Sequence, residues 1–379
     1  MSALRVDLFV VPPSPDSELQ RVEAVVAAAE HAIEHHRYAE AAAALVDNEP
    51  SLTAFPEQAV RALLAESWAR MYLGQIPRAE ALLERARVVA EGRRFSDVDR
   101  AEVLYRLGCC RLQRFSVTNA VSLFTLALEL CNRSNLSCDR LRARVLEWRA
   151  RCYQVQRDWE AARADIERAL ELAEALGDEL TLAHVLFQAS IVDERTGQLV
   201  VARCYAEQAK DLFERCGDRQ SLARVTNNLG GLAFLLGEPE RAKAYLLEAL
   251  GFALEAGSEP DAAQAISSLA QVHLRTGEAE QAEEQARRAV ELLAGRVDFL
   301  DEIGNAQLVL GRALAEQRLD AEATAWFRSA EESFEQVGSV SHRAAVWMAQ
   351  GDLAAQRGRP EAAVELYRRA AEALQDFHF

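Results

Sequence analysis

The sequence predicts an all-α protein, and within that class an α-solenoid of about nine helix-turn-helix repeats. Three observations carry the prediction. Alanine, leucine, glutamate and arginine, which favour helices, dominate the chain, whereas only 9 of its 379 residues are prolines. Alanine-rich apolar patterns recur at a spacing of about 40 residues. Glycines recur at a constant offset from that pattern, where a helix would end.

The repeat is most visible in three stretches that share one pattern. They are "NNLGGLAFLLGEPERAKAYLLEAL" (227–250), "SSLAQVHLRTGEAEQAEEQARRAVELL" (267–293) and "MAQGDLAAQRGRPEAAVELYRRAAEAL" (348–374). Each has a small residue in a first helix, a turn with glycine, and a second helix that opens its apolar pattern with alanine. That alanine falls at Ala41, Ala79, Ala120, Ala162, Ala202, Ala242, Ala282, Ala323 and Ala363.

The small residue of the first helix lies twelve positions before that alanine. It is Ser67, Gly108, Ala150, Ser190, Gly230, Ala270, Gly311 or Gly351. A glycine inside a helix costs roughly 0.5–1 kcal/mol relative to alanine, so Gly230 needs a compensating role. We expect it to lie where two helices cross, because a larger side chain there would force the helices apart.

Turn residues fit the same frame. Five glycines each precede the alanine of the second helix by five residues, a position that commonly ends a helix. Three prolines begin second helices, where the missing backbone N–H costs little. The glycines are Gly74, Gly197, Gly237, Gly277 and Gly358, and the prolines are Pro77, Pro239 and Pro360.

In these residues the chain resembles the tetratricopeptide repeat family, in its longer form of about 40 residues per helix pair. The resemblance covers residues 17–375, with a degenerate first repeat, and leaves an N-terminal arm (1–16) and a C-terminal tail (376–379). It implies a right-handed superhelical solenoid. The longer repeat occurs in bacterial peptide-pheromone receptors of the Rap and PlcR kind, in sensor regions of actinobacterial transcription regulators and in animal spindle-orientation adaptors.

The resemblance also implies which side chains line the concave groove, because fixed positions of each first helix point into it. Counted from the small residue, they include acids, amides, aromatics and an excess of arginine. Asn and Gln can bind the backbone of an extended peptide, and arginine can bind its carboxylates. The predicted groove residues are Arg144, Glu147, Trp148, Arg151, His184, Phe187, Gln188, Arg195, Arg224, Asn227, Asn228, Phe234, Gln264, Gln271, Arg275, Asn305 and Arg312.

Two alternatives to a ligand groove stay open at this stage. The same side chains are compatible with an ordinary solvated helix face, and some of the arginines are expected to pair with Glu147 or Glu194. The family's carboxylate clamp, which needs Lys and Asn at two positions of one repeat, is not supported. Those positions hold Glu147 and Arg151 in one repeat, and Asn227 and Gly231 in another.

Composition limits the compartment and the partners. A formal net charge of −16 disfavours nonspecific binding to nucleic acid or to an anionic membrane. No apolar run reaches the roughly 18 residues of a membrane span, and the N-terminal "ALRVDLFVV" does not lead into a cleavage site of the secretory kind. Seven cysteines without a C-x-x-C pair predict buried thiols in a reducing cytosol. Basic residues other than Lys210 and Lys243 are arginines, which indicates a GC-rich, bacterial genome.

Catalytic motifs are weak. His31, Glu34 and His35 spell H-x-x-E-H, an inverted zinc-protease motif, but no third ligand can be assigned. Phosphate-binding loops, dinucleotide fingerprints and G-x-S-x-G elbows do not occur in the sequence. We therefore expect no enzyme activity, no metal and no cofactor.

The leading hypothesis is a cytoplasmic bacterial regulator or adaptor that captures a peptide or a partner segment in its concave groove. Residues 1–20 are too few for a DNA-binding helix-turn-helix, so control of transcription would need a regulatory partner. The alternative is a self-associating scaffold, a homo-oligomer formed through the N-terminal arm and through Phe377 and Phe379. Whether the arm fills the groove stays open.

Overall fold

The computed structural model describes residues 15–34, 37–48 and 54–375, and within these ranges every regular element is a helix. The all-α prediction is confirmed for this part of the chain. The chain divides into two compact units, Met1–Leu107 and Gly108–Phe379. The prediction of one solenoid domain over residues 17–375 therefore stays a prediction. The N-terminal arm up to residue 14, His35 and the tail from residue 376 lie outside the described residues.

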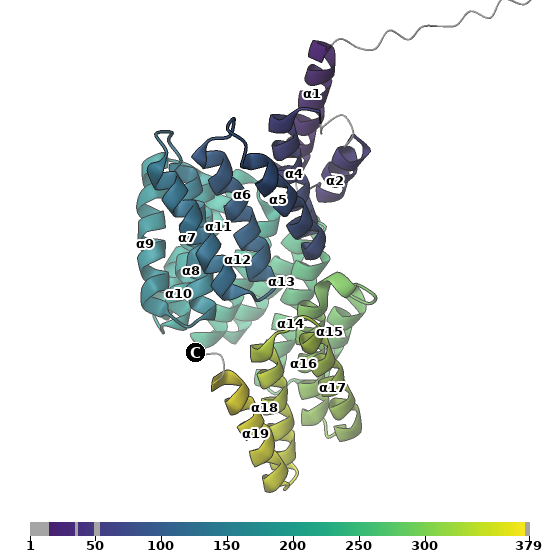
Figure 1. Ribbon diagram of the computed structural model, residues 1–379. Coiled ribbons are helices and arrows are strands. Elements are labelled where there is room, and N and C mark those ends of the chain that lie inside the picture. Colours follow the sequence, from purple (N-terminus) through teal and green to yellow (C-terminus); the bar gives the residue numbers. More distant parts are fainter. Residues whose placement is uncertain (1–14, 35–36, 49–53, 376–379) are drawn as a thin grey trace, which may run out of the picture. The chain divides into compact units, whose positions relative to one another are not determined.

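The helices follow one another in pairs, a first helix and a second helix, as the ribbon in Figure 1 shows. In the first unit they are α1 (Pro15–Glu34), α2 (Tyr38–Asp47), α4 (Pro56–Tyr72), α5 (Ile76–Ala90) and the start of α6 (Asp97–Gln113). The second unit continues with α7 (Val117–Arg133), α8 (Asp139–Val155), α9 (Trp159–Leu176), α10 (Glu179–Arg195), α11 (Leu199–Cys216), α12 (Arg219–Leu235), α13 (Pro239–Glu255), α14 (Glu259–Arg275), α15 (Ala279–Leu292), the short 3₁₀ helix η1 (Val297–Phe299), α16 (Leu300–Glu316), α17 (Asp320–Gln336), α18 (Val340–Gln356) and α19 (Pro360–Gln375).

The core of the first unit forms between α1, α2 and α4. Val22 and Val26 of α1 pack with Leu45 of α2 and with alanines of α4. The rings of Tyr38 and Tyr72 stack with their centroids 4.6 Å apart. The degenerate first repeat is thus still an ordinary helix pair whose apolar faces are buried.

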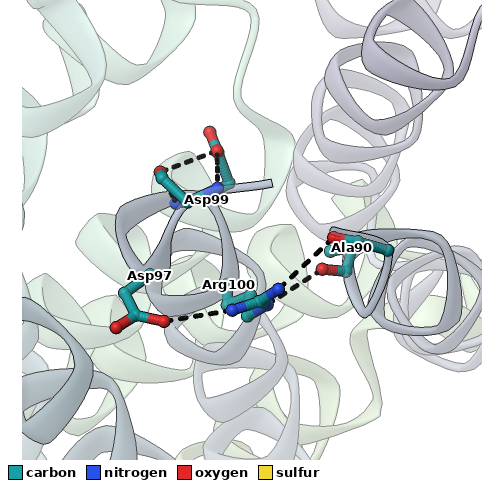
Figure 2. Close-up of polar contacts among 6 residues, drawn as sticks. Ala90, Asp97, Asp99 and Arg100 are labelled. Carbon is teal, nitrogen blue, oxygen red and sulfur yellow. Dashed lines mark hydrogen bonds and ion pairs between the residues drawn. The ribbon is translucent and has the colours of Figure 1, made fainter. Parts of the chain in front are cut away.

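Arg100 of α6 forms hydrogen bonds with the residues that connect α5 to α6 (Figure 2). Arg100 donates from Nε to the carbonyl oxygen of Ala90 at 3.0 Å and from Nη2 to that of Gly92 at 3.3 Å. Ala90 is the last residue of α5 and Gly92 follows it, so no further helix turn can satisfy the carbonyl of Ala90. Arg100 also donates to Asp97 Oδ1 at 3.1 Å, and Ser96 donates to Asp99, which fixes the start of α6.

Size matching between the two helices of a pair explains the helical glycines. A Cβ on Gly230 would lie 2.7 Å from the Leu246 side chain, closer than real Cβ contacts allow. Large residues likewise oppose the equivalent glycines: Phe124 faces Gly108, Phe327 faces Gly311 and Tyr367 faces Gly351. The predicted packing role of Gly230 is confirmed. Gly231 differs, because a Cβ there would meet no atom within 4 Å.

The predicted turn glycines all have positive φ, from 70° at Gly358 to 82° at Gly277. Three repeats place other residues at the same offset before the second helix. Phe115, Arg157 and Arg318 there have φ of 56°, 60° and 63°. The turn geometry is therefore common to these repeats, and only some of them carry the glycine that favours it.

Cysteine burial agrees with the sequence prediction in part. Five of the seven cysteines are buried. The prediction is wrong for Cys204 and Cys216, which are exposed. Burial raises the pKa of Cys152 to about 12. Among the described residues, no helix is both long enough and apolar enough to cross a membrane.

Candidate ligand-binding surface

The predicted groove residues lie on five first helices of the second unit. Each of these helices contacts the next first helix directly, from α8 through α10, α12 and α14 to α16. We call this set of side chains the inner face. By helix it comprises Arg144, Glu147, Trp148 and Arg151 on α8; His184, Phe187, Gln188 and Arg195 on α10; Arg224, Asn227, Asn228 and Phe234 on α12; Gln264, Gln271 and Arg275 on α14; and Asn305 and Arg312 on α16.

Burial separates the inner-face residues into three groups. The buried ones are Glu147, Trp148 and Gln188. The exposed ones are Arg195, Arg224, Gln264, Gln271 and Arg275, and the half-buried ones are Arg144, Arg151, His184, Phe187, Asn227, Asn228, Phe234, Asn305 and Arg312. Most of the face is thus partly covered by neighbouring helices and partly open.

A charged cluster forms on α8. Glu147 is only 3% exposed, and its Oε1 lies 2.6 Å from Nη2 of Arg151. The guanidinium of Arg151 also covers the Trp148 ring, 4.4 Å from its centroid. Two donors of this cluster nevertheless lack a hydrogen-bond partner although they are buried, Nε of Arg151 and Nε2 of Gln154. Such donors are costly unless something accepts from them.

His184 of α10 lies next to this cluster. Its Nε2 is 3.9 Å from Oδ2 of Asp218, and its ring meets Phe213 edge to face. Burial lowers the pKa of His184; Glu147 and Asp218 oppose that shift, and the arginines of α8 add to it. The neutral imidazole is therefore favoured at neutral pH, although a third of the side chain stays exposed.

The two neighbouring asparagines of α12 have different surroundings. Asn228 links two helices: its Nδ2 donates to Glu194 at 2.7 Å, and its Oδ1 accepts from Ser190 at 3.2 Å. Asn227 has a buried Oδ1 without a partner in the described part of the chain, as does the hydroxyl of Thr226 one residue earlier. Of the pair, Asn227 is the amide with free hydrogen-bonding capacity.

Arg224 is exposed but engaged in an ion pair. Its Nε donates to Oδ1 of Asp261 at 2.8 Å, while Gln220 and Ser258 donate to the other oxygen at 2.9 and 2.6 Å. Burial alone would raise the pKa of Asp261, but Arg224 and these hydrogen bonds hold it below its usual value. This pair connects α12 to α14.

Sequence reasoning missed Asp261 as a member of this surface. The groove positions predicted from the sequence all lie after the first turn of each first helix, whereas Asp261 lies in the first turn of α14. A signal was present, because Ser258 and Asp261 have the spacing of a capping box. The carboxylate also affects Glu302 of α16, whose pKa is raised by burial and by neighbouring carboxylates.

A cationic group lies further along the inner face, on α14 and α16. The guanidinium of Arg275 is 5.9 Å from the centroid of the Phe234 ring. Burial lowers the pKa of Arg312, and the nearby charge of Arg275 lowers it further, while Asp352 of α18 opposes the shift. Asp352 already accepts a hydrogen bond from Oη of Tyr367 at 2.7 Å.

Some predicted residues are not brought together with the others by polar contacts of their side chains. Among these, the side chains of Gln188, Arg195, Gln264, Gln271 and Asn305 form no hydrogen bond or ion pair with the residues that the structure describes. Among the same residues no group of three or more His, Cys, Asp or Glu side chains is arranged to hold a metal. The zinc motif cannot be placed, because His31 lies in α1 but His35 falls outside the described ranges.

Sequence models of the tetratricopeptide repeat match three parts of the chain. One matches residues 141–215 and 221–294, and another matches residues 334–376, together just over half of the chain. No curated protein sequence matches. The matched ranges cover nearly all of α8 to α15, which carry most of the inner face.

Solved structures share the fold over almost the whole chain. A Rap protein complexed with competence and sporulation factor superposes with a TM-score of 0.69 at 16% identity, over 94% of this chain and 98% of that one. The Rap conjugation gene regulator of the plasmid pLS20, in complex with the Phr* peptide, gives 0.60 at 14% identity, over 94% and 96%. Aspartyl phosphate phosphatase F from Bacillus subtilis gives 0.59 at 12% identity, over 99% and 96%. This similarity shows an α-solenoid of tetratricopeptide repeats.

Proposed function

Because the chain belongs to the tetratricopeptide repeat family, we propose that it is a non-enzymatic regulator or adaptor that holds a peptide or partner segment against the inner face. The repeat builds a surface of successive first helices, and function resides in the side chains that this surface presents. We assign no cofactor and no catalytic step. The predominance of arginine over lysine favours a bacterial source, and seven cysteines without a C-x-x-C pair favour a reducing cytosol.

Unsatisfied polar atoms on the first helices are the observation that carries the proposal. Nε of Arg151, Nε2 of Gln154 and Oδ1 of Asn227 are buried without a partner in the described chain, although each of these side chains is partly exposed. Buried polar atoms are normally paired, so unpaired donors and acceptors on one surface indicate that something else completes them. An extended peptide carries N–H and C=O groups at regular spacing and suits both kinds of atom.

The related structures add a limited argument. Two of them are described as complexes, one with the Phr* peptide and one with competence and sporulation factor. At 14–16% identity they share the fold with this chain, and the ligand chemistry must come from its own side chains. One of the similar structures is described as an aspartyl phosphate phosphatase, so a protein with this fold can carry the name of an enzyme. The proposal therefore needs a test of peptide binding and a test of phosphatase activity.

Selection from a displayed library of random peptides on the full-length protein tests the proposal. Enriched peptides are synthesised, and their affinities are measured by fluorescence anisotropy. The combined substitution N227A/Q154A should weaken binding by about tenfold or more, because two hydrogen-bonding groups are lost. The matched control is Gln281→Ala on the second helix α15, an exposed amide without a described partner.

Three results would contradict the proposal. One is the absence of any enriched peptide, and another is equal binding by the double variant and the wild type. The third is release of phosphate from an aspartyl-phosphate protein by this chain. If no peptide is enriched and sedimentation shows a homo-oligomer, a self-associating scaffold replaces the peptide-binding regulator as the function that the results support.

A further inference from the structure

An exposed apolar stripe runs along the second helix α13. It consists of Ala244, Leu247, Gly251 and Leu254, which follow one another in steps of three and four residues and therefore share one side of the helix. The side chains of Leu247 and Leu254 are 56% and 57% exposed. Both leucines thus leave much of their apolar surface in water.

The stripe departs from the pattern of other second helices. Leu247, Gly251 and Leu254 lie 5, 9 and 12 residues after the first alanine of their helix, Ala242. Charged residues occupy the same three positions on α9, α11 and α17. They are Glu167, Glu171 and Glu174; Glu207, Asp211 and Glu214; and Arg328, Glu332 and Glu335. An apolar surface where related helices carry charge is typical of an interaction site.

Gly251 has no packing role within its own chain. A Cβ at this position would meet no atom within 4 Å, whereas a Cβ on Gly230 would lie 2.7 Å from Leu246. Glycine is disfavoured inside a helix, and no close neighbour in the described chain compensates for it here. The missing side chain leaves a gap between Leu247 and Leu254, into which a side chain from another molecule can fit.

The stripe is complementary to itself when two copies run antiparallel. Small and large residues alternate along it, so Leu247 then lies against Gly251 of the other copy, and Leu254 lies against its Ala244. The same size matching joins the two helices of one pair. We propose that α13 packs antiparallel against α13 of a second copy of this chain, with the two-fold axis level with Ala249, and forms a symmetric dimer. The dimer goes beyond the proposed function, because the inner face belongs to the first helices and stays separate from this contact.

The carboxylates beside the stripe do not oppose this contact. Glu248 and Glu255 each follow one of the leucines, but each already has a cation from the preceding repeat. Nζ of Lys210 lies 2.9 Å from Glu248, and Nε of Arg219 lies 3.4 Å from Glu255. Two copies can therefore approach without strong repulsion. A basic helix of another protein is less favoured, because these carboxylates have little unpaired charge left to attract it.

The next second helix, α15, adds complementary charge. Lys243 lies four residues before Leu247 and reaches Glu278, which directly precedes α15, at 2.7 Å. The side of α13 that carries the stripe therefore faces α15. Antiparallel packing places α15 of each copy opposite α15 of the other. Arg288 and Glu291, exposed and without a partner among the described residues, would then meet across the two-fold axis.

Sedimentation velocity of the full-length protein over a range of concentrations tests the dimer. Because a contact of this size is small, the dimer should dissociate on dilution. L247E and G251E introduce the charge that α11 carries at these positions, and each should weaken association by about tenfold or more, since a carboxylate would lose water without gaining a partner. The control Leu136→Glu changes a leucine of similar exposure, 59%, between α7 and α8 and should leave association unchanged.

G251L separates size matching from simple adhesion of an apolar patch. The added leucine enlarges the apolar surface, and its Cβ meets no atom of its own chain within 4 Å. It also fills the gap that Leu247 of the second copy needs, so association should weaken by about tenfold. Stronger association in G251L would mean that the patch is merely adhesive, which overturns the proposal.

Spin labels measure the direction of the two helices. The label is attached through E240C, an exposed position in the first turn of α13, after C204S and C216S have removed the two exposed thiols. Antiparallel packing about Ala249 places the two labelled residues roughly 30 Å apart, given a rise of about 1.5 Å per residue and helix axes about 8–10 Å apart. A separation below about 20 Å would indicate parallel helices and overturn the proposal.

Two further results overturn the dimer. One is a monomer at every concentration, and the other is undiminished association in L247E and G251E variants whose circular dichroism matches that of the wild type. The peptide selection described above is read independently. Enriched peptides with a monomeric protein leave the proposed function in place and remove the dimer, whereas a dimer without enriched peptides does the reverse.

Discussion

Replacing Gly230 with alanine tests the size matching between first and second helices. The new Cβ would lie 2.7 Å from both Cγ and Cδ2 of Leu246, and 3.4 Å from the carbonyl oxygen of Ala242. Leu246 is 1% exposed and cannot turn into solvent. Either the leucine changes rotamer or α12 and α13 move apart.

The expected size of the effect follows from two opposing contributions. Overpacking a close contact costs about 1–3 kcal/mol. Alanine recovers up to about 1 kcal/mol of helix propensity relative to glycine. G230A should therefore range from nearly neutral to about 2 kcal/mol less stable. Gly231 is the matched control, because a Cβ there meets no atom within 4 Å, and G231A should gain up to about 1 kcal/mol.

A compensating variant makes this prediction sharper. L246A removes the atoms that the new Cβ would meet and recreates the alanine pair found at the equivalent positions Ala270 and Ala286. L246A alone should cost about 2–5 kcal/mol. In that background G230A should be neutral or stabilising, which corresponds to a coupling of about 1–3 kcal/mol.

Urea unfolding followed by circular dichroism measures these differences, with hydrogen exchange in α12 and α13 as the local measurement. Exchange is needed because repeat proteins do not always unfold in one step. The reasoning is refuted if G230A and G231A change stability equally, or if the effects of G230A and L246A simply add.

Three further predictions concern the turns, the ion pairs and the thiols. Arg157→Gly should raise the stability of the protein by about 0.5–1 kcal/mol, because a φ of 60° is strained for arginine. Gly237→Ala should lower the stability by a similar amount. Thermal unfolding measures both changes, and a loss of stability in R157G would contradict this prediction. Asp261 has a lowered pKa in the folded chain, so its contribution is present above its usual value near 3.8 and is lost as the pH falls. The stability difference between wild type and D261N should therefore shrink from about pH 5 to about pH 2, and a constant difference would argue against the ion pair with Arg224. Maleimide should modify Cys204 and Cys216 in the native protein and reach buried Cys152 only after unfolding, as peptide mass spectrometry can check.

The helical architecture was predictable because its causes are local and repeated. An alanine spacing near 40 residues, a small residue twelve positions earlier and a glycine five positions earlier each follow from helix and turn geometry. Gly230 could be assigned a packing role because helix propensity alone disfavours it. The size of its partner could not be read from the pattern, since the same position of the second helix holds Leu246, Phe327 or Ala286.

The periodicity of the sequence could not predict which side chains pair across helices. The sequence places Arg224, Asn228 and Arg312 on one helix face, and it treats them alike. Tertiary packing separates them: Arg224 meets Asp261, Asn228 meets Glu194, and Arg312 meets no carboxylate within the described chain. Asp261 lies 37 positions after Arg224 and Glu194 lies 34 positions before Asn228, so both partners belong to neighbouring repeats. Whether such residues meet is set by how the helices pack and not by the spacing within one helix.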